Sequence, residues 1–169
     1  MTAIRFTAMP AADAEALWRG GTDAYGCLPE TAMSDGPGHP CRHCLANIDA
    51  GEQFLVFAYR PFPRLQPYAE TGPVFLHGQT CRRYAAEDAL PPVLSGTRDF
   101  IVRGYGDDDR IVYGTGAVTA TADIAAYATT LLERSDIAYV HVRSARNNCY
   151  QCRIDRQKAP LLAEIGAFI

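Results

Sequence analysis

The chain has 169 residues, 48% of them hydrophobic, which is enough apolar material for the core of one domain. Its formal net charge of -3 is small and argues against a protein that coats nucleic acid. The N-terminus lacks a basic region followed by an apolar run, and no segment approaches the roughly 18 apolar residues of a membrane helix. We therefore expect a single cytoplasmic domain, residues 1–169, without nucleic-acid or membrane partners.

Cysteine and arginine are the two unusual features of the composition. In a reducing compartment, the six cysteines are expected to be metal ligands, redox thiols or core residues rather than a disulfide framework. Lys158 is the only lysine, so nearly all basic side chains are arginines. A GC-rich genome would produce that bias, and so would a need for guanidinium groups that bind carboxylate or phosphate.

The first half of the chain predicts a strand, a helix and two further strands. Ile4–Thr7 alternates in polarity, and Pro10 followed by AADAEALW predicts a helix that ends at Gly20. The stretch 20–40 is rich in glycine and proline and is expected to be a long surface connection. Two apolar runs are expected to be strands within a sheet: Phe54–Tyr59 and Val74–His77.

The second half predicts four more strands and the most clearly amphipathic helix. Segment 85–95 contains two prolines and is expected to be an excursion from the sheet. The expected strands are Phe100–Tyr105, Arg110–Tyr113, Ala138–Arg143 and Cys149–Ile154. Thr121 or Asp123 is a candidate cap for the helix Asp123–Arg134, whose apolar residues share one face. Pro160–Phe168 is compatible with a short helical turn.

The order and spacing of these elements predict the fold class. Strands outnumber helices, and most neighbouring strands are joined by short connections, which favours antiparallel pairing. We predict an α+β fold: a single domain with a mainly antiparallel sheet and one or two helices packed on one face. The apolar face of the helix Asp123–Arg134 is expected to pack on the sheet.

The strongest local signal is the C-x-x-C motif at Cys41 and Cys44. Two thiolates at this spacing can bind one tetrahedral ion from a tight turn, and zinc then needs two further ligands. His77 ends a predicted strand and Cys81 follows soon after, so the four residues form a candidate zinc site. The 32 residues between the two pairs match no common zinc-ribbon template, and Leu45 stands where a zinc knuckle often has glycine.

A redox function is the alternative interpretation of the same motif. Arg42 and His43 between the thiols would favour a thiolate at Cys41 and make it a nucleophile. The candidate catalytic residues are then Cys41, Cys44 and His43, and Cys41 is expected to be the more exposed thiol. A third interpretation is that both cysteines simply fill a turn under the sheet.

The predicted hairpin Ala138–Ile154 contains a second candidate site. Strand alternation assigns one face to Val140, Val142, Tyr150, Cys152 and Ile154, which are expected to face the helix. The other face is expected to hold Tyr139, His141, Arg143, Cys149, Gln151 and Arg153. It is either solvated or the floor of an anion pocket. The second C-x-x-C motif, Cys149 and Cys152, would need a bulge to chelate a metal.

Glu70 lies in a proline- and glycine-rich segment just before a predicted strand. It is a candidate general base if it is buried, or a residue that orders the turn. Together with His141 and Arg143 it is a candidate ligand-binding residue for a small molecule or anion. Motifs for hydrolases, nucleotide-binding proteins and metalloproteases are missing from the sequence.

These segments resemble a bacterial family known as domain of unknown function 1203. The resemblance is carried by Pro40–Leu45, Gly51-Glu52, Pro67–Phe75, Tyr139–Arg143 and Cys149-Tyr150. It covers most of the chain and implies a small bacterial protein. It implies no activity, substrate or catalytic residue.

Three hypotheses therefore remain open from the sequence. The leading one is a bacterial cytoplasmic domain with a structural or ligand-binding zinc site near Cys41. The alternatives are a thiol-dependent enzyme that uses Cys41 and a metal-free module that binds a small anion.

Overall fold

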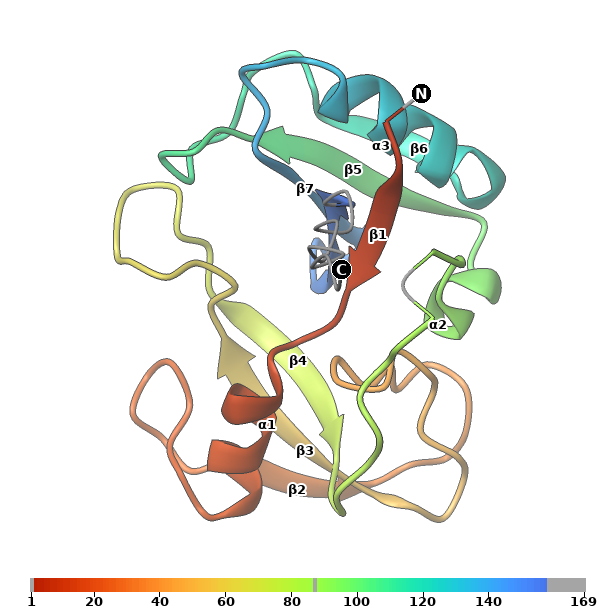
Figure 1. Ribbon diagram of the computed structural model, residues 1–169. Coiled ribbons are helices and arrows are strands. Elements are labelled where there is room, and N and C mark those ends of the chain that lie inside the picture. The colour runs from red at the N-terminus through yellow and green to blue at the C-terminus, as the bar shows by residue number, and fades with distance from the viewer. Residues whose placement is uncertain (1, 87, 158–169) are drawn as a thin grey trace, which may run out of the picture.

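A computed structural model describes residues 2–86 and 88–157, and its frame is a pair of antiparallel sheets (Figure 1). The larger sheet has the strand order β1-β8-β7-β5-β6 and the smaller has the order β2-β3-β4. The strands are β1 (Ile4–Thr7), β2 (Glu30–Met33), β3 (Gln53–Tyr59), β4 (Gly72–His77), β5 (Asp99–Tyr105), β6 (Ala117–Ala120), β7 (Tyr139–Ser144) and β8 (Tyr150–Arg156). The helices are α1 (Ala11–Trp18), α2 (Pro92–Ser95), the 3-10 turn η1 (Thr121–Asp123) and α3 (Ile124–Leu132).

The larger sheet buries one face against α3, at the top of the molecule in Figure 1. Val140 and Val142 of β7 are fully buried in one cluster with Ile124 and Leu131 of α3. Each such side chain contributes roughly 1.5–3 kcal/mol relative to its exposed state. Every strand pairing in both sheets is antiparallel, and the predicted α+β fold is confirmed.

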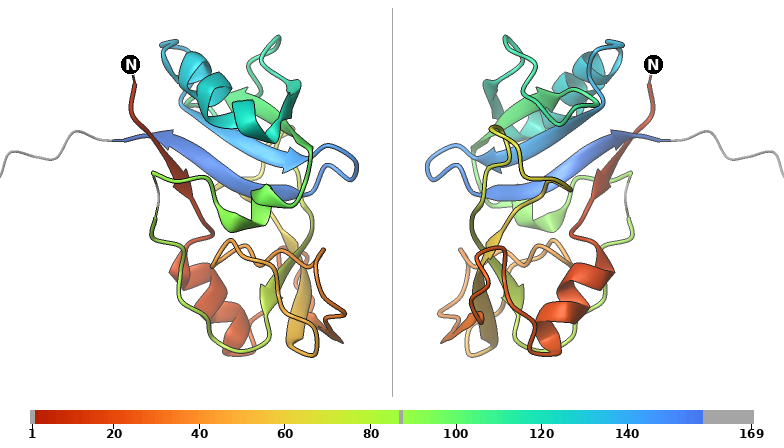
Figure 2. Two further views of the ribbon diagram at one scale, coloured as in Figure 1. Left: turned by 90° about the vertical axis from the view of Figure 1, so that its right-hand side faces the viewer. Right: turned by 90° about the vertical axis from the view of Figure 1, so that its left-hand side faces the viewer.

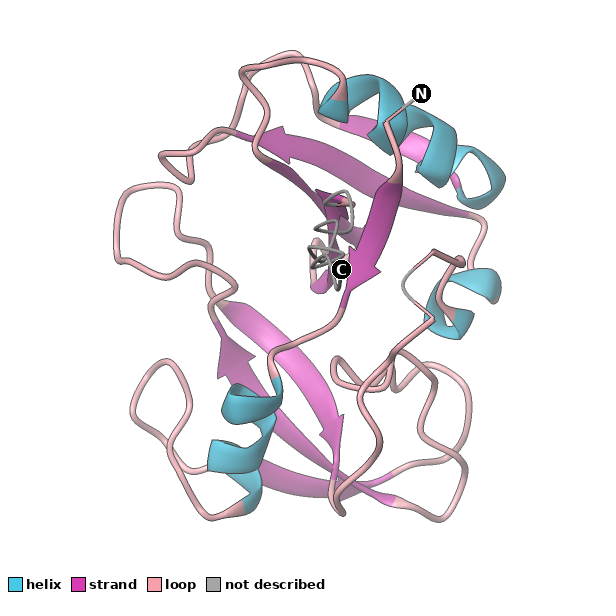
Figure 3. Cartoon of the chain, in the orientation of Figure 1, coloured by secondary structure: helices cyan, strands magenta, loops and turns pink. Residues whose placement is uncertain are grey.

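The smaller sheet has its own apolar cluster, which α1 completes. Leu17 of α1 packs with Phe57 of β3 and Leu76 of β4. Figure 3 shows α1 beside this sheet and α3 beside the other one, so each helix serves a different sheet. In the part of the chain that the structure describes, no helix has the length and apolarity needed to cross a membrane.

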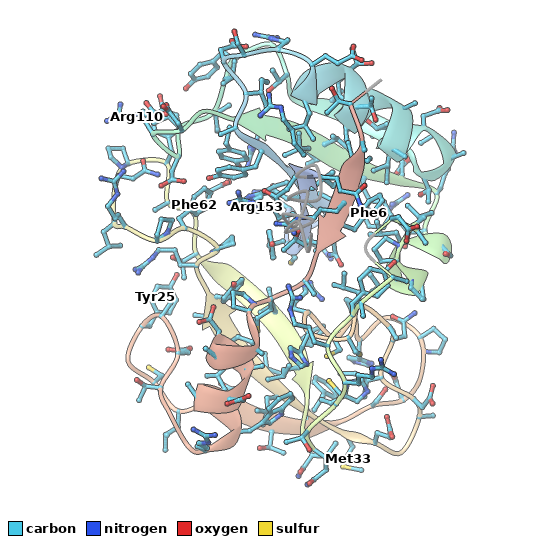
Figure 4. The ribbon with its side chains drawn as sticks, in the orientation of Figure 1. Phe6, Tyr25, Met33, Phe62, Arg110 and Arg153 are labelled. Atoms are coloured by element: carbon cyan, nitrogen blue, oxygen red, sulfur yellow. The ribbon has the colours of Figure 1, made fainter. Side chains whose placement is uncertain are left out.

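The loop 60–71 between β3 and β4 reaches back to the larger sheet. Phe62 of this loop is buried with Tyr105 and Tyr139, and Gln66 Nε2 donates to the carbonyl of Asp109 at 3.1 Å. Figure 4 places Phe62 beside the larger sheet, whereas Met33 of β2 projects from the opposite end of the molecule. The two side views of Figure 2 show the same arrangement of one sheet above the other.

Three expected local structures differ from the observed ones. Arg110–Tyr113 is not a strand: only Ile111 makes an isolated bridge, to Tyr105, because the chain turns at Asp109 and again at Gly114, both with positive φ. The strand beside β5 is instead β6. The connection 20–40 contains the exposed strand β2, and segment 85–95 contains the short helix α2. The helical turn expected at Pro160–Phe168 lies outside the described residues.

Gly104 in β5 lets Ile137 pack directly against the strand. A Cβ atom at Gly104 would lie 2.5 Å from Cδ1 of Ile137, which is fully buried. Gly104→Ala is therefore expected to lower the free energy of unfolding by about 1–3 kcal/mol, measured by urea denaturation. Gly116→Ala is the matched control, because its Cβ would lie 3.8 Å from the nearest atom, Cδ of Arg103. Equal losses in the two variants would contradict the packing argument.

Candidate functional site

The first two candidate ligands lie on a tight turn that is bound to β4. Cys41 forms a parallel bridge with Phe75, and the N–H of Leu45 donates to the carbonyl of Cys41 at 3.0 Å. Leu45 has a φ of 53°, so it adopts the left-handed conformation that glycine usually supplies. The backbone of Cys44 acts to lower the pKa of Cys41, and the backbone of Ala46 acts to lower the pKa of Cys44. The turn thus forms without glycine, and its backbone favours the thiolate form of both cysteines.

The other two candidate ligands come from the end of β4 and the chain that follows. His77 is the last residue of β4, and its carbonyl accepts a hydrogen bond from Trp18 Nε1 at 2.8 Å. Gly78 turns the chain away in close contact with β3. A Cβ atom there would lie 2.9 Å from the carbonyl oxygen of Gln53. Because the chain can pass so close to β3, Cys81 lies beside the turn that carries Cys41 and Cys44.

The structure brings the four sequence-predicted ligands together in a group that can hold a metal ion. Their ligand atoms all lie within 4.8 Å of one another. Cys41 Sγ lies 3.8 Å from Cys81 Sγ, and Cys44 Sγ lies 3.6 Å from His77 Nδ1. Cys41 is buried, and the other three are partly buried. The cluster therefore has one shielded side and one side near solvent.

The three thiols are too close for all of them to ionise easily on their own. Hydrogen bonds from the thiols of Cys44 and Cys81 lower the pKa of Cys41. The interaction with Cys41 raises the pKa of Cys44 to about 11 and raises that of Cys81 as well. One thiolate is thus favoured at the expense of its neighbours. A bound divalent cation would reverse this preference, because its charge stabilises every thiolate that coordinates it.

Two further side chains contact the cluster from outside. Glu52 Oε2 lies 3.4 Å from His77 Nε2, the ring nitrogen that does not approach Cys44. The hydrogen bond with Cys41 raises the pKa of His77, and the charge of Glu52 acts in the same direction. His43 Nδ1 lies 3.3 Å from Cys81 Sγ. Desolvation lowers the pKa of His43, so its ring is neutral at neutral pH.

One premise of the thiol-enzyme hypothesis is wrong. We expected Cys41 to be the more exposed thiol, but it is fully buried, because it pairs with β4 and belongs to the apolar cluster of the smaller sheet. Desolvation lowers the pKa of His43, which opposes a positive charge beside Cys41. Arg42 is also buried, and its guanidinium donates to backbone carbonyls, including that of Tyr150. The turn is therefore poorly arranged to present Cys41 as a nucleophile.

A second polar cluster surrounds Glu70 where the loop 60–71 meets the larger sheet. Glu70 Oε2 accepts hydrogen bonds from Arg103 Nη2 and from the hydroxyl of Tyr105, and lies 3.0 Å from Arg143 Nη2. Its other oxygen accepts from Asn148 Nδ2 at 3.3 Å. Glu70 thus pairs with two arginines and ties the loop to β5 and β7. This arrangement matches a residue that orders a turn better than it matches a general base.

His141 lies behind this cluster and is completely buried. Four rings surround it at centroid distances of 4.6–5.2 Å: Tyr105, Tyr150, Tyr139 and Phe62. Neither ring nitrogen has a hydrogen-bond partner among the described residues. Desolvation lowers the pKa of His141 well below its ordinary value, and the charge of Arg143 lowers it further. His141 does face away from α3 as expected, but it is sealed from solvent.

The structure therefore separates the three candidate ligand-binding residues. Glu70 and Arg143 line a cavity of about 340 Å³, together with Tyr59, Asn148 and Cys149. His141 does not line it, because the aromatic rings fill the space between. A ligand in this cavity would meet an arginine that already has a carboxylate partner.

A β-bulge alters the face that β8 presents. His141 pairs with Arg153, but the register then shifts so that Arg143 pairs with Tyr150, and Gln151 is left as the extra residue. Tyr150 was expected to face α3, and this is wrong: its ring packs on His141. Cys152 remains buried in the cluster that contains α3. The bulge does not bring the second C-x-x-C pair into any metal-binding group of the described residues.

Several residues of these sites are not identified by the sequence analysis. Arg103 offers one signal, because it is a charged residue that directly follows the apolar run Phe100–Val102 within β5. Glu52 and Trp18 offer none, because they reach His77 only after β3, β4 and α1 have packed together.

A family model described as "Protein of unknown function (DUF1203)" matches residues 38–156, which include all four candidate metal ligands and the three candidate ligand-binding residues Glu70, His141 and Arg143. The comparisons with curated proteins and with solved structures found no match.

The ion pairs of Glu70 are expected to stabilise the fold more than an exposed pair does. Glu70→Gln leaves Arg103 and Arg143 without their carboxylate, and both are largely buried. We expect the free energy of unfolding to fall by about 1–3 kcal/mol, measured by urea denaturation. Asp136→Asn, which breaks the exposed pair with Arg134, should change it little. A similar small effect in both variants would remove the structural role of Glu70.

His141 predicts a loss of stability in mild acid. The folded state keeps His141 neutral, whereas the unfolded chain binds a proton with a pKa of about 6.5. Its contribution is therefore complete above that pH and is lost as the pH falls, by up to about 1.4 kcal/mol per pH unit. In His141→Phe this loss should vanish. The test is the unfolding free energy of the wild type minus that of the variant, which should be constant above pH 7 and fall below pH 6. A constant difference throughout would contradict the assignment.

Proposed function

The chain belongs to the family described as protein of unknown function (DUF1203), and we propose that it binds one zinc ion through Cys41, Cys44, His77 and Cys81. Three cysteines and one histidine are one of the common ligand sets of structural zinc sites. Their soft sulfur donors favour zinc over magnesium or calcium, which prefer oxygen.

The spacing of the four donor atoms carries this proposal. In a tetrahedral site with zinc–sulfur bonds of about 2.3 Å and a zinc–nitrogen bond of about 2.0 Å, two sulfurs lie about 3.8 Å apart and a sulfur and a nitrogen about 3.5 Å apart. The sulfurs of Cys41 and Cys81 are 3.8 Å apart, and Cys44 Sγ is 3.6 Å from His77 Nδ1. These two distances are opposite edges of one tetrahedron, so together they involve all four ligands.

The surroundings of His77 support coordination through Nδ1. Glu52 is placed to accept a hydrogen bond from Nε2, at 3.4 Å. A carboxylate on the second ring nitrogen is a common feature of zinc-bound histidines, because it fixes the tautomer and the ring orientation. His43 can likewise donate from Nδ1 to the sulfur of Cys81. Such a bond would stabilise a thiolate at that ligand.

The ligand count favours a structural role over a catalytic one. Four protein ligands fill a tetrahedral shell and leave no position for water or substrate. The ligands come from three places along the chain: the turn at Cys41, the end of β4 and the segment after it. All three contact the smaller sheet, whose three strands and single helix supply a small core. Coordination would therefore add stability where burial of apolar surface is limited.

The same chemistry sets a condition on where the protein works. Zinc binds thiolates, so the three cysteines must stay reduced. We propose the cytoplasm as its location on this ground, because its thiol systems keep cysteines reduced.

Metal analysis of the full chain tests the zinc proposal. Protein purified without chelator or nickel resin is expected to contain about one zinc per chain. Cys44→Ser should lose the metal and melt at a lower temperature, because zinc stabilises only the folded state. Cys27→Ser is the matched control, because Cys27 is exposed and lies outside the cluster. It should retain the metal and the melting temperature of the wild type.

Cobalt substitution adds a spectroscopic test of the ligand set. Cobalt bound by three thiolates and an imidazole should give sulfur-to-cobalt charge-transfer bands. Cys81→Ser removes one of the thiolates and should strongly reduce these bands. His77→Ala keeps all three thiolates, so any loss of intensity in that variant should come only from a change in geometry. Failure of the reduced wild-type protein to take up either zinc or cobalt would overturn the proposal.

A further inference from the structure

The larger of two neighbouring cavities lies between the sheets and is separate from the cysteine cluster. It encloses about 510 Å³, within the usual range for small-molecule sites. Its wall is formed by the turn 37–47, β4, α2 with the start of β5, and the connection between β7 and β8. Four segments that are distant in sequence therefore meet around one space.

Of the residues that the structure describes, Arg42 is the only charged one in the wall of this cavity. Its side chain is only 2% exposed, and its Nε and Nη1 atoms donate to the carbonyls of Tyr150 and Pro40. Among the described residues, no carboxylate pairs with Arg42. A buried guanidinium without an anionic partner is costly, because carbonyl dipoles do not cancel its charge. The cavity beside it is where a counter-charge can enter.

The remaining wall suits the body of an organic molecule. Phe75, Phe100 and Val93 provide apolar surface, while Asn147, Gln151 and Thr97 provide neutral hydrogen-bonding groups. In the part of the chain that the structure describes, no aspartate or glutamate contributes to the wall. Apolar and polar groups contribute comparable parts of the wall, and with one charge they suit a small ligand that has both an apolar body and polar substituents.

A comparison with the smaller cavity beside Glu70 favours Arg42 as the anion-binding residue. The two cavities share Pro73, Asn147 and Cys149 as a common wall. In the smaller one, Arg143 already faces the carboxylate of Glu70 at 3.0 Å. An anion there would have to compete with Glu70 for Arg143, whereas among the described residues no carboxylate competes for Arg42.

We propose that the inter-sheet cavity binds a small organic anion, with one carboxylate or phosphate group at Arg42 and an apolar body against Phe75 and Phe100. The site is distinct from the zinc site, although Arg42 follows Cys41 in the chain. A zinc ion with three thiolates and a neutral histidine carries a net charge of -1, which offers Arg42 an alternative partner. Binding measurements on the zinc-loaded protein distinguish the two possibilities, because a small anion can bind there only if the zinc cluster does not already satisfy Arg42.

Matched ligands test the need for the anionic group. Benzoate and phenyl phosphate should each raise the melting temperature of the zinc-loaded full chain in a saturable way, and their relative affinities show whether carboxylate or phosphate is preferred. Benzamide has the shape of benzoate without its charge and should have little effect. An equal shift with benzamide, or no shift with either anion, overturns the proposal.

Two variants locate the site. Arg42→Gln should weaken binding of the preferred anion by about tenfold or more, measured by titration calorimetry. Gly96→Leu should weaken binding without removing charge, because Gly96 lines the cavity, has an ordinary φ of -87° and has open space around an added Cβ. It also keeps the test valid if Arg42→Gln fails to fold. Wild-type affinity in Gly96→Leu would overturn the assignment to this cavity.

Cys149 provides a local readout in the unmodified protein. It lines both cavities, whereas Cys27 is exposed and lines neither. Saturating anion should slow alkylation of Cys149 several-fold while Cys27 reacts at an unchanged rate, as followed by mass spectrometry. Equal rates at Cys149 with and without the anion would place the anion elsewhere and overturn the proposal.

Discussion

The turn Pro40–Leu45 is the joint that holds the two sheets together. The N–H of Arg42 donates to the carbonyl of Phe75 in the smaller sheet at 3.0 Å, and its side chain donates to the carbonyl of Tyr150 in the larger one. Its own carbonyl accepts from the N–H of Met9, between β1 and α1, at 2.9 Å. One residue thus uses its backbone and side chain to connect three parts of the fold. Because these groups are buried, each lost bond would leave a polar group unsatisfied.

The same turn holds the segment that follows β4. The carbonyl of His43 accepts from the N–H of Tyr84, and the carbonyl of Leu45 accepts from the N–H of Val93, each at 2.9 Å. A metal ion bound at Cys41 and Cys44 would therefore stabilise both the smaller sheet and the segment that follows β4. It would also fix Arg42 at the wall of the inter-sheet cavity. The two proposed sites are in this sense mechanically linked, although each has its own ligand and its own test.

The arginines between the sheets differ in how their charge is balanced. Arg103 and Arg143 share the carboxylate of Glu70, and Arg153 pairs with Asp155 at 2.6 Å. Arg42 has only carbonyl partners. Carboxylate partners therefore account for the charge of three of these arginines, whereas Arg42 is the one to which the anion-binding proposal applies. The sequence favours Arg143 as the anion-binding arginine instead of Arg42. Arg143 lies on a predicted strand, where alternation assigns each side chain to a face, whereas Arg42 lies in a turn without such a pattern.

Local pattern was sufficient to predict the strands β3, β4, β5 and β7, the helix α3 and the antiparallel α+β class, because side-chain periodicity depends on neighbours in sequence. Ligand chemistry likewise singled out Cys41, Cys44, His77 and Cys81. The division into two sheets, the bulge at Gln151 and the burial of Cys41 were decided by the tertiary structure. So were the contacts of Glu70 with Arg103 and Arg143. These features depend on which distant segments pair, and pairing depends on the packing of the whole chain rather than on any local run of residues.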